Sequence, residues 1–134
     1  MCLKVGLSAK PIQNGGEPIT CWKVVRELEG IGKYKPFYYN GMETYVDGST
    51  YCISDEDDFL AQKMEINLGF HSYANEEEAK NKFRLMQSPI WYGLEIPFCL
   101  IKCEIPTGAY YFKGVFSERK CYCSSKIKIV GKVC

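Results

Sequence analysis

The residue with the widest chemical scope in this 134-residue chain is its only histidine, His71, which stands in the segment 69–73 (GFHSY). An imidazole changes charge near neutral pH, so it can serve as a general acid, a general base or an anion contact. Because the chain holds no second histidine, a metal site built on paired histidines and a His–His acid–base pair are excluded. Three hypotheses stay open for His71: an anion contact, an acid–base group, and local packing or capping.

The segment around His71 directly precedes a predicted helix that begins at Asn75. Backbone N–H groups at a helix N-terminus can bind anions such as phosphate. Lys23 or Arg26 would add positive charge, and tyrosine rings, which crowd the segment 34–51, would stack on the rest of the ligand. The predicted ligand-binding residues are therefore Lys23, Arg26, Phe70, His71, Ser72 and Tyr73. On this hypothesis His71→Ala abolishes ligand retention and leaves the Tm nearly unchanged, whereas a large loss of stability would indicate a structural histidine.

The chain also contains eight cysteines, whose thiols are a second set of reactive side chains. Cys99 and Cys103 share a face with Ile101 and Ile105, and a free cysteine packs like a small apolar residue. Since the chain begins without an apolar export signal, the pattern predicts thiols that are mostly reduced and structural.

Two alternatives would use the thiols chemically. One is a zinc site, although no Cys-x-x-Cys pair is present. The other is a nucleophilic pair of one cysteine with His71, for which the spacing selects no particular cysteine. The leading interpretation includes neither a metal nor another cofactor. The residues of the zinc alternative are Cys99, Cys103, Cys121 and Cys123.

The composition is typical of one globular domain, with 46% hydrophobic and 25% charged residues. The formal net charge is only +1, so no basic field favours a nucleic-acid polymer as partner. No segment reaches the roughly 20 apolar residues that a membrane-spanning helix needs. We therefore expect a cytoplasmic protein with no membrane partner, and a homo-oligomer stays open.

Strand and helix signals predict an α+β fold with a mainly antiparallel sheet. Residues 1–18 hold several glycines and prolines and are expected to form an irregular leader to a single domain over 19–134. Alternating apolar residues indicate strands, and Asp-Gly is typical of a tight hairpin turn. The predicted sheet elements are strands at 19–26, 99–105 and 126–133 and a hairpin over 44–53 around Asp47-Gly48.

Two helices are predicted. Asn75 followed by three glutamates favours the start of the main helix, over about 75–87, because carboxylates stabilise the positive end of a helix. Ala79, Phe83 and Met86 form its apolar stripe. A short helix is expected over about 55–64, behind Ser54 as its cap.

Several short segments resemble a loose set of small, uncharacterised proteins from gut bacteria and their phages. The matching segments are 21–25 (CWKVV), 69–73 with the helix that follows, 101–108 (IKCEIPTG) and 124–129 (SSKIKI). The resemblance implies a phage protein that acts in the host cytoplasm, and it carries no established activity.

A second resemblance is to the ADP-ribosyltransferase fold. Trp22-Lys23 stands where that family has an aromatic residue followed by Arg or His, and Gly69-Phe70 leads through small polar residues into a helix, as in the family. The last strand offers Lys126 and Lys128 where the family has its catalytic Glu. The resemblance therefore implies a nucleotide pocket without the catalytic acid.

The leading functional hypothesis is a non-catalytic binding protein for a small, anionic, nucleotide-like ligand. A phage sponge for a host immune-signalling nucleotide, which is an anti-defence role, would be one such protein. The first alternative is a nucleotide-processing enzyme that uses His71 for ADP-ribosyl transfer or phosphodiester cleavage. The second is a protein–protein interaction module that inhibits a host protein.

Overall fold

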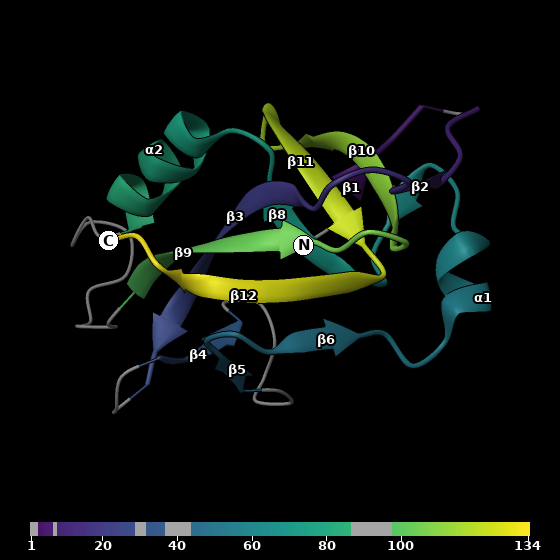
Figure 1. Ribbon diagram of the computed structural model, residues 1–134. Helices are drawn as coiled ribbons and strands as arrows, with labels where there is room; N and C mark the ends of the chain where they lie inside the picture. Colours follow the sequence, from purple (N-terminus) through teal and green to yellow (C-terminus); the bar gives the residue numbers. More distant parts are fainter. Residues whose placement is uncertain (1–2, 7, 29–31, 37–43, 87–97) are drawn as a thin grey trace.

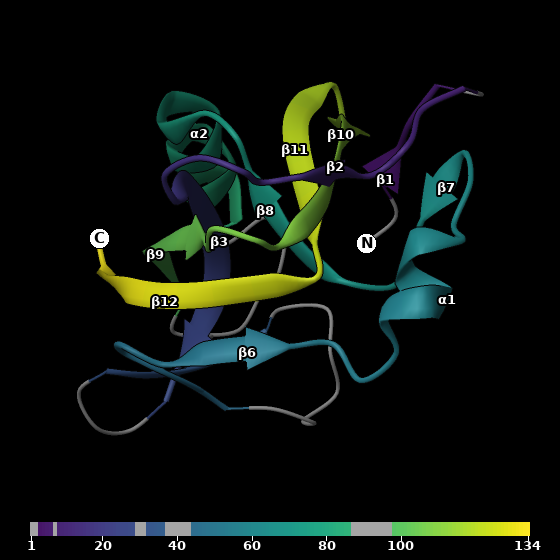
Figure 2. The ribbon, with the colours of Figure 1, turned by 45° about the vertical axis from the view of Figure 1, so that its right-hand side comes forward.

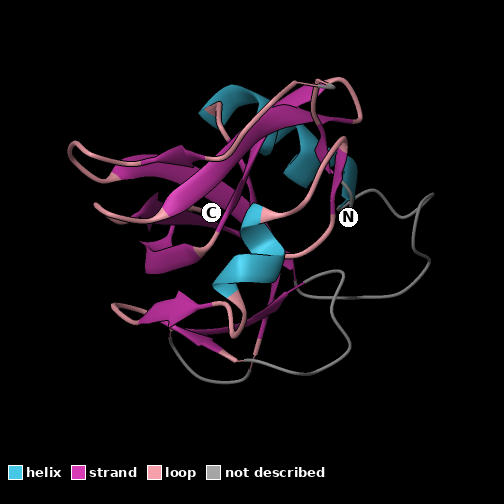
Figure 3. Ribbon diagram, turned by 90° about the vertical axis from the view of Figure 1, so that its right-hand side faces the viewer, coloured by secondary structure: helices cyan, strands magenta, loops and turns pink. Residues whose placement is uncertain are grey.

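The computed structural model describes residues 3–6, 8–28, 32–36, 44–86 and 98–134. These residues form an α+β fold dominated by its sheet, in which every strand pair is antiparallel (Figures 1 and 3). The strands are β1 (Leu3–Lys4), β2 (Ile12–Gln13), β3 (Ile19–Glu27), β4 (Lys33–Pro36), β5 (Tyr45–Val46), β6 (Thr50–Cys52), β7 (Glu65–Ile66), β8 (Phe70–Tyr73), β9 (Phe98–Ile105), β10 (Tyr110–Phe116), β11 (Arg119–Ser124) and β12 (Lys126–Lys132). The helices are α1 (Glu56–Leu60) and α2 (Glu76–Met86).

Strand β3 is the point at which the sheet forks. One edge of β3 pairs with β9 from Ile19 to Arg26. The other edge meets β8 at Trp22 and β4 from Val25 to Glu27. The strand order is β6-β12-β9-β3-β8-β11-β10-β1-β7, with β4 and β5 branching from β3 and with β2 on β10. Figure 2 shows the branch of β12 and β6 well apart from the branch of β10 and β11.

The predicted hairpin over 44–53 is wrong, although its turn is present. Gly48 has a φ of +81°, as a tight turn requires, but β5 pairs with β4 and β6 pairs with β12. The backbone N–H of Gly48 donates to Ile129 O at 2.7 Å, which ties the turn to β12. The Asp-Gly signal is local, whereas the partner of each strand is chosen by packing with residues far along the chain.

The first 18 residues are less irregular than expected, because two short strands attach them to the domain. β1 pairs with β10 and β7, and β2 pairs with β10. Leu3 is fully buried. Its strand crosses β10 at Gly114, where a Cβ would collide with Lys4 O and with the Leu3 side chain. The absence of a side chain at Gly114 is therefore what lets β1 approach.

Helix α2 confirms the main predicted helix, and residue 87 lies outside the described residues. Ala79, Phe83 and Met86 are buried as predicted. Helix α1 is shorter than the predicted 55–64, and its cap is Asp55, whose carboxylate accepts from Asp58 N at 3.0 Å. Neither described helix is long and apolar enough to cross a membrane.

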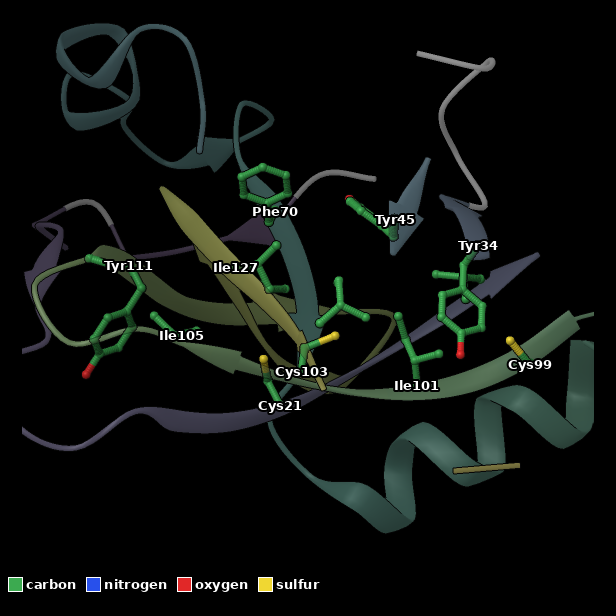
Figure 4. Close-up of a cluster of buried hydrophobic side chains, with 13 residues drawn as sticks. Cys21, Tyr34, Tyr45, Phe70, Cys99, Ile101, Cys103, Ile105, Tyr111 and Ile127 are labelled. Carbon is green, nitrogen blue, oxygen red and sulfur yellow. The ribbon is translucent and has the colours of Figure 1, made fainter. Parts of the chain in front are cut away.

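Two core clusters lie on opposite faces of β9 among the described residues. The odd residues of β9, such as Ile101, belong to the first core cluster, and Phe98 and Leu100 belong to the second. The first core cluster consists of Cys21, Val25, Tyr34, Tyr45, Phe70, Cys99, Ile101, Cys103, Ile105, Ala109, Tyr111, Ile127 and Ile129 (Figure 4). The second consists of Leu3, Phe59, Ile66, Tyr73, Ala79, Phe83, Met86, Phe98, Leu100, Phe112, Cys121 and Cys123, and it includes the buried stripe of α2.

Candidate functional site

Four of the six predicted ligand-binding residues lie on β8, which is an inner strand and not a loop in front of the helix. β8 lies between β3 and β11, and His71 is directly opposite Cys123 in the antiparallel register. Successive side chains of a strand point to opposite faces. Phe70 and Ser72 therefore face the first core cluster, and His71 and Tyr73 face the second. The structure thus divides the predicted site between two faces.

His71 is held inside the protein by a backbone carbonyl. Its Nε2 lies 2.9 Å from Ile66 O. A carbonyl only accepts, so Nε2 carries the proton and Nδ1 does not. Burial, together with the nearby charge of Lys23, lowers the pKa of His71 to about 4, and the hydrogen bond to Ile66 O opposes this shift only in part. The imidazole is therefore neutral at pH 7, which suits a structural role better than a phosphate contact.

Cys123 is the cysteine that lies beside His71, which the spacing in the sequence could not select. Its Sγ lies 3.9 Å from His71 Nδ1, but the thiol donates to Leu68 O at 3.3 Å. The Cys123 side chain is fully buried. A nucleophilic thiol needs access to substrate and a base that takes up its proton. This arrangement directs the thiol proton to a carbonyl and is therefore poorly suited to nucleophilic catalysis.

The start of α2 does not offer the predicted phosphate site. Asn75 Oδ1 accepts from Glu78 N at 3.1 Å, which occupies one of the free backbone donors. Glu76, Glu77 and Glu78 fill the first turn. Their carboxylates already complement the positive end of the helix and would repel a phosphate. The anion-binding part of the hypothesis must therefore rest on other groups.

Lys23 is such a group. On β3 it shares a face with Cys21 and Val25, both in the first core cluster. Its Nζ donates to the backbone carbonyl of His71 and lies 5.8 Å from the centroid of the Tyr45 ring. Burial lowers the pKa of the Lys23 amine. Among the described residues, Lys23 forms no ion pair with a carboxylate.

Polar and aromatic groups surround this part of the first core cluster. The Ser72 hydroxyl is buried without a regular hydrogen bond, next to the Cys21 thiol. Burial raises the pKa of Cys21 to about 11, and the Ser72 hydroxyl offsets this only in part, so the thiol stays neutral at pH 7. The Tyr45 and Phe70 rings lie 6.5 Å apart, and Figure 4 shows them on the same side of the strand that carries Cys103.

Arg26 is not brought together with Lys23. It lies three residues further along β3, so its side chain points to the opposite face. In the register it is opposite Lys35 of β4 and Phe98 of β9. Its Nε is buried and has no hydrogen-bond partner among the described residues. Tyr73 also lies on that second face, in the second core cluster.

The four cysteines of the zinc alternative do not meet. Cys99 and Cys103 belong to the first core cluster, and Cys121 and Cys123 belong to the second. In the described part of the chain no group of three or more His, Cys, Asp or Glu residues could hold a metal ion. Among the described cysteines, the free thiols are those of Cys21, Cys52, Cys99, Cys103, Cys121 and Cys134.

Sequence reasoning identified Lys23 and Ser72 and expected tyrosines of the segment 34–51 to contact the ligand, but it did not single out Tyr45 or place Cys21 beside Lys23. The period of two along 19–26 could have placed Cys21 beside Lys23. Tyr45 had no such signal, because it reaches Lys23 only through the pairing of β5 with β4 and of β4 with β3.

Comparison of the chain with family models, with curated proteins and with solved structures gives no match. The function must therefore be inferred from the geometry around Lys23.

Proposed function

We propose that the protein is a non-catalytic binding protein for a small, anionic, nucleotide-like ligand, held on the face of β3 and β8 that carries Lys23, Phe70 and Ser72. One observation carries the proposal: Lys23 lies largely inside the protein with a neutral carbonyl and an aromatic ring as its partners, and with no carboxylate ion pair among the described residues. A buried cation without a counter-charge is costly, and a bound anion would supply the counter-charge.

The neighbouring groups favour a nucleotide over a simple inorganic anion. Lys23 supplies positive charge for a phosphate. The Ser72 hydroxyl has hydrogen-bonding capacity left over. The edges of the Tyr45 and Phe70 rings are suited to contact an aromatic base. Anion binding should also draw a proton onto Lys23, because an adjacent negative charge raises the pKa of an amine.

Two features argue for binding without turnover. His71 is neutral and engaged with Ile66 O, so it is poorly placed as an acid–base group. Lys126 and Lys128 stand where the resemblance to ADP-ribosyltransferases would put the catalytic acid. A phage-encoded sponge for a host immune-signalling nucleotide, acting in the host cytoplasm, is the biological role that we favour.

A thermal-shift and calorimetric screen tests the proposal with ADP-ribose, cyclic dinucleotides and mononucleotides. A ligand at about 100 times its Kd adds about 2.7 kcal/mol of stability, which should raise the Tm by about 5 °C or more. Chromatography of the incubated nucleotide should show no turnover.

Lys23→Met and Lys102→Met form a matched pair for this screen. Lys102 is exposed on β9, opposite Trp22. We expect Lys23→Met to remove the ligand-induced shift and Lys102→Met to retain it. An equal loss in both variants, or no shift with any nucleotide, would contradict the proposal, and turnover would favour the enzyme alternative.

A further inference from the structure

The surroundings of Lys23 have a consequence for its reactivity as well as for its charge. Within the described part of the chain, the Nζ atom has one hydrogen-bond acceptor, the backbone carbonyl of His71, and it lies beside the Tyr45 ring. The groups next to it on β3 are the Cys21 thiol and the apolar Val25, neither of which is charged at pH 7. Such surroundings favour a neutral amine, and lysines desolvated in this way are the ones that act as nucleophiles.

No carboxylate among the described residues forms an ion pair with the Lys23 amine. The described ion pairs are Lys80–Glu76 and Lys132–Glu27, and Lys23 takes part in neither. Burial has the largest effect on the pKa of the Lys23 amine and lowers it, and the buried thiols of Cys103, Cys21, Cys123 and Cys121 offset this only in part. Lys23 as a whole residue is nevertheless only partly buried.

We propose that Lys23 of the ligand-free protein is a reactive amine that condenses with the carbonyl group of a small anionic aldehyde to form an imine. The proposal concerns the face of the proposed function and rests on it only for the preference for an anion. A nucleotide and the aldehyde would compete for Lys23, because the nucleotide favours the ammonium form and the aldehyde consumes the free amine.

The reaction needs no oxidant, reductant or metal. The lone pair of Nζ attacks the carbonyl carbon and forms a C–N bond, and the carbonyl oxygen takes up a proton to give a carbinolamine. Loss of the second N–H proton and departure of the hydroxyl as water leave the imine, so one amine and one aldehyde give one imine and one water. Protonation of the imine produces a cation, which an anionic group on the aldehyde would balance. The His71 carbonyl accepts an N–H of the free amine and so orients its lone pair.

Limited reductive labelling of the full-length protein tests the proposal. The probe is pyridoxal 5′-phosphate at one equivalent with cyanoborohydride, followed by intact mass spectrometry and peptide mapping. We expect one adduct per chain, mapped to Lys23, in the wild-type protein and in Lys102→Arg. Lys23→Arg, which keeps a cation but has no primary amine, should lose at least about 90% of the adduct, since an arginine is effectively always protonated.

The pH dependence separates a reactive amine from ordinary surface labelling. An exposed lysine gains about tenfold in free amine for each pH unit below its usual pKa. We expect labelling of Lys23 to rise less steeply than that between pH 7 and 9, because burial lowers the pKa of its amine. Pyridoxal without the phosphate should label Lys23 at least about threefold more slowly, since it lacks the balancing charge.

The outcomes for the two proposals are distinct. Adducts spread over exposed lysines, or a tenfold rise per pH unit at Lys23, would overturn the reactive amine. Labelling of Lys23 that nucleotides slow would support both proposals. Labelling of Lys23 that no nucleotide slows would support the reactive amine and count against the nucleotide-binding function. Circular dichroism of Lys23→Arg checks that a lost adduct reflects the missing amine and not an unfolded chain.

Discussion

Two basic side chains, His71 and Lys23, lie on opposite faces of the sheet beside the backbone of β8. They differ in how many of their hydrogen-bond donors have a partner. The His71 imidazole points toward the second core cluster, while the Lys23 amine lies on the side of the first and donates to the carbonyl of His71. Burial lowers the pKa of both groups. His71 becomes a neutral ring whose N–H has a carbonyl partner. Lys23 has up to three N–H donors and, among the described residues, one hydrogen-bond acceptor.

The comparison shows that the rarity of a residue type indicates function less strongly than a buried side chain whose hydrogen-bond donors are not all paired. A buried polar group with its partners in place contributes to a unique core. A buried group with donors left over leaves the protein able to gain from a ligand. The single histidine is therefore the structural member of the pair, and the lysine is the functional candidate.

Gly69→Ala should disrupt the packing around His71 and have the largest effect on the free energy of unfolding. Gly69 has a φ of +129°, and a Cβ there would lie 2.6 Å from Cys123 Sγ and 2.8 Å from Phe59 Cε2. We expect a loss of about 3 kcal/mol in the free energy of unfolding, measured with urea. Gly108→Ala is the matched control, with a φ of +89° and open space around its Cβ, and should cost only about 1 kcal/mol. Equal losses would mean that the contacts around Cys123 are not tightly packed.

His71→Ala should cost about 2 kcal/mol of stability, because it leaves Ile66 O without its donor and opens space beside Cys123. This reverses the expectation from sequence that the Tm stays nearly unchanged. Urea unfolding of the variant at pH 7.5 measures the loss. An unchanged Tm together with lost nucleotide binding would restore His71 as a ligand contact.

The pH dependence of stability also tests whether His71 has a structural role. The pKa of His71 is about 4 in the folded protein, below its ordinary value of 6.5, so the unfolded chain binds the proton more readily. The stabilisation is fully present above pH 6.5 and is lost as the pH falls toward 4, by on the order of 3 kcal/mol. Urea unfolding between pH 7.5 and 4 should show this fall in the wild-type protein, and His71→Gln should show less of it. A fall of equal size in both proteins would assign it to other groups.

Lys23→Met should raise the free energy of unfolding, whereas His71→Ala should lower it, and the change should be smaller. Removing an amine that lacks a counter-charge should stabilise the protein by about 1 kcal/mol at pH 7. Because the folded pKa of Lys23 lies below its ordinary value of 10.5, the unfolded chain binds more protons and the stability of the wild-type protein should rise with pH toward that value. This rise should be weaker in Lys23→Met, as measured by urea unfolding at pH 7 and 9. A destabilised variant would show that the Lys23 charge is compensated in the free protein.

The smallest expected effect comes from a comparison of Phe70, in the first core cluster, with Phe83, in the second. Phe70 and Phe83 are each 8% exposed, but Phe70 lies beside Tyr45 and Phe83 lies on α2. Both Phe→Leu variants should lose about 1 kcal/mol of stability. Only Phe70→Leu should also weaken nucleotide binding, by about threefold to tenfold in calorimetry. Equal affinities in the two variants would place the ligand away from Phe70.

Local patterns in the chain were enough to predict several elements of the fold. The cap at Asn75, the three glutamates and the stripe of Ala79, Phe83 and Met86 predicted α2 closely. The alternation of cysteine and isoleucine predicted β9, and the signals of strands and helix together predicted an α+β class with a mainly antiparallel sheet, although the sheet dominates the structure more than that class implies. The turn at Asp47-Gly48 was also predicted, but the hairpin was not formed, because β5 and β6 pair with strands distant in the sequence.

Residue types and their period within one strand were readable from the chain, so Lys23 and Ser72 could be named as candidates. The period also implies that His71 and Ser72 face opposite ways once the segment is known to be a strand. Only the tertiary structure decided that it is an inner strand, and that Ile66 O engages the imidazole while Lys23 receives no carboxylate ion pair in the described part of the chain. The physical reason is that the partners of a buried base come from separate strands, and long-range pairing, not local sequence, brings those strands together.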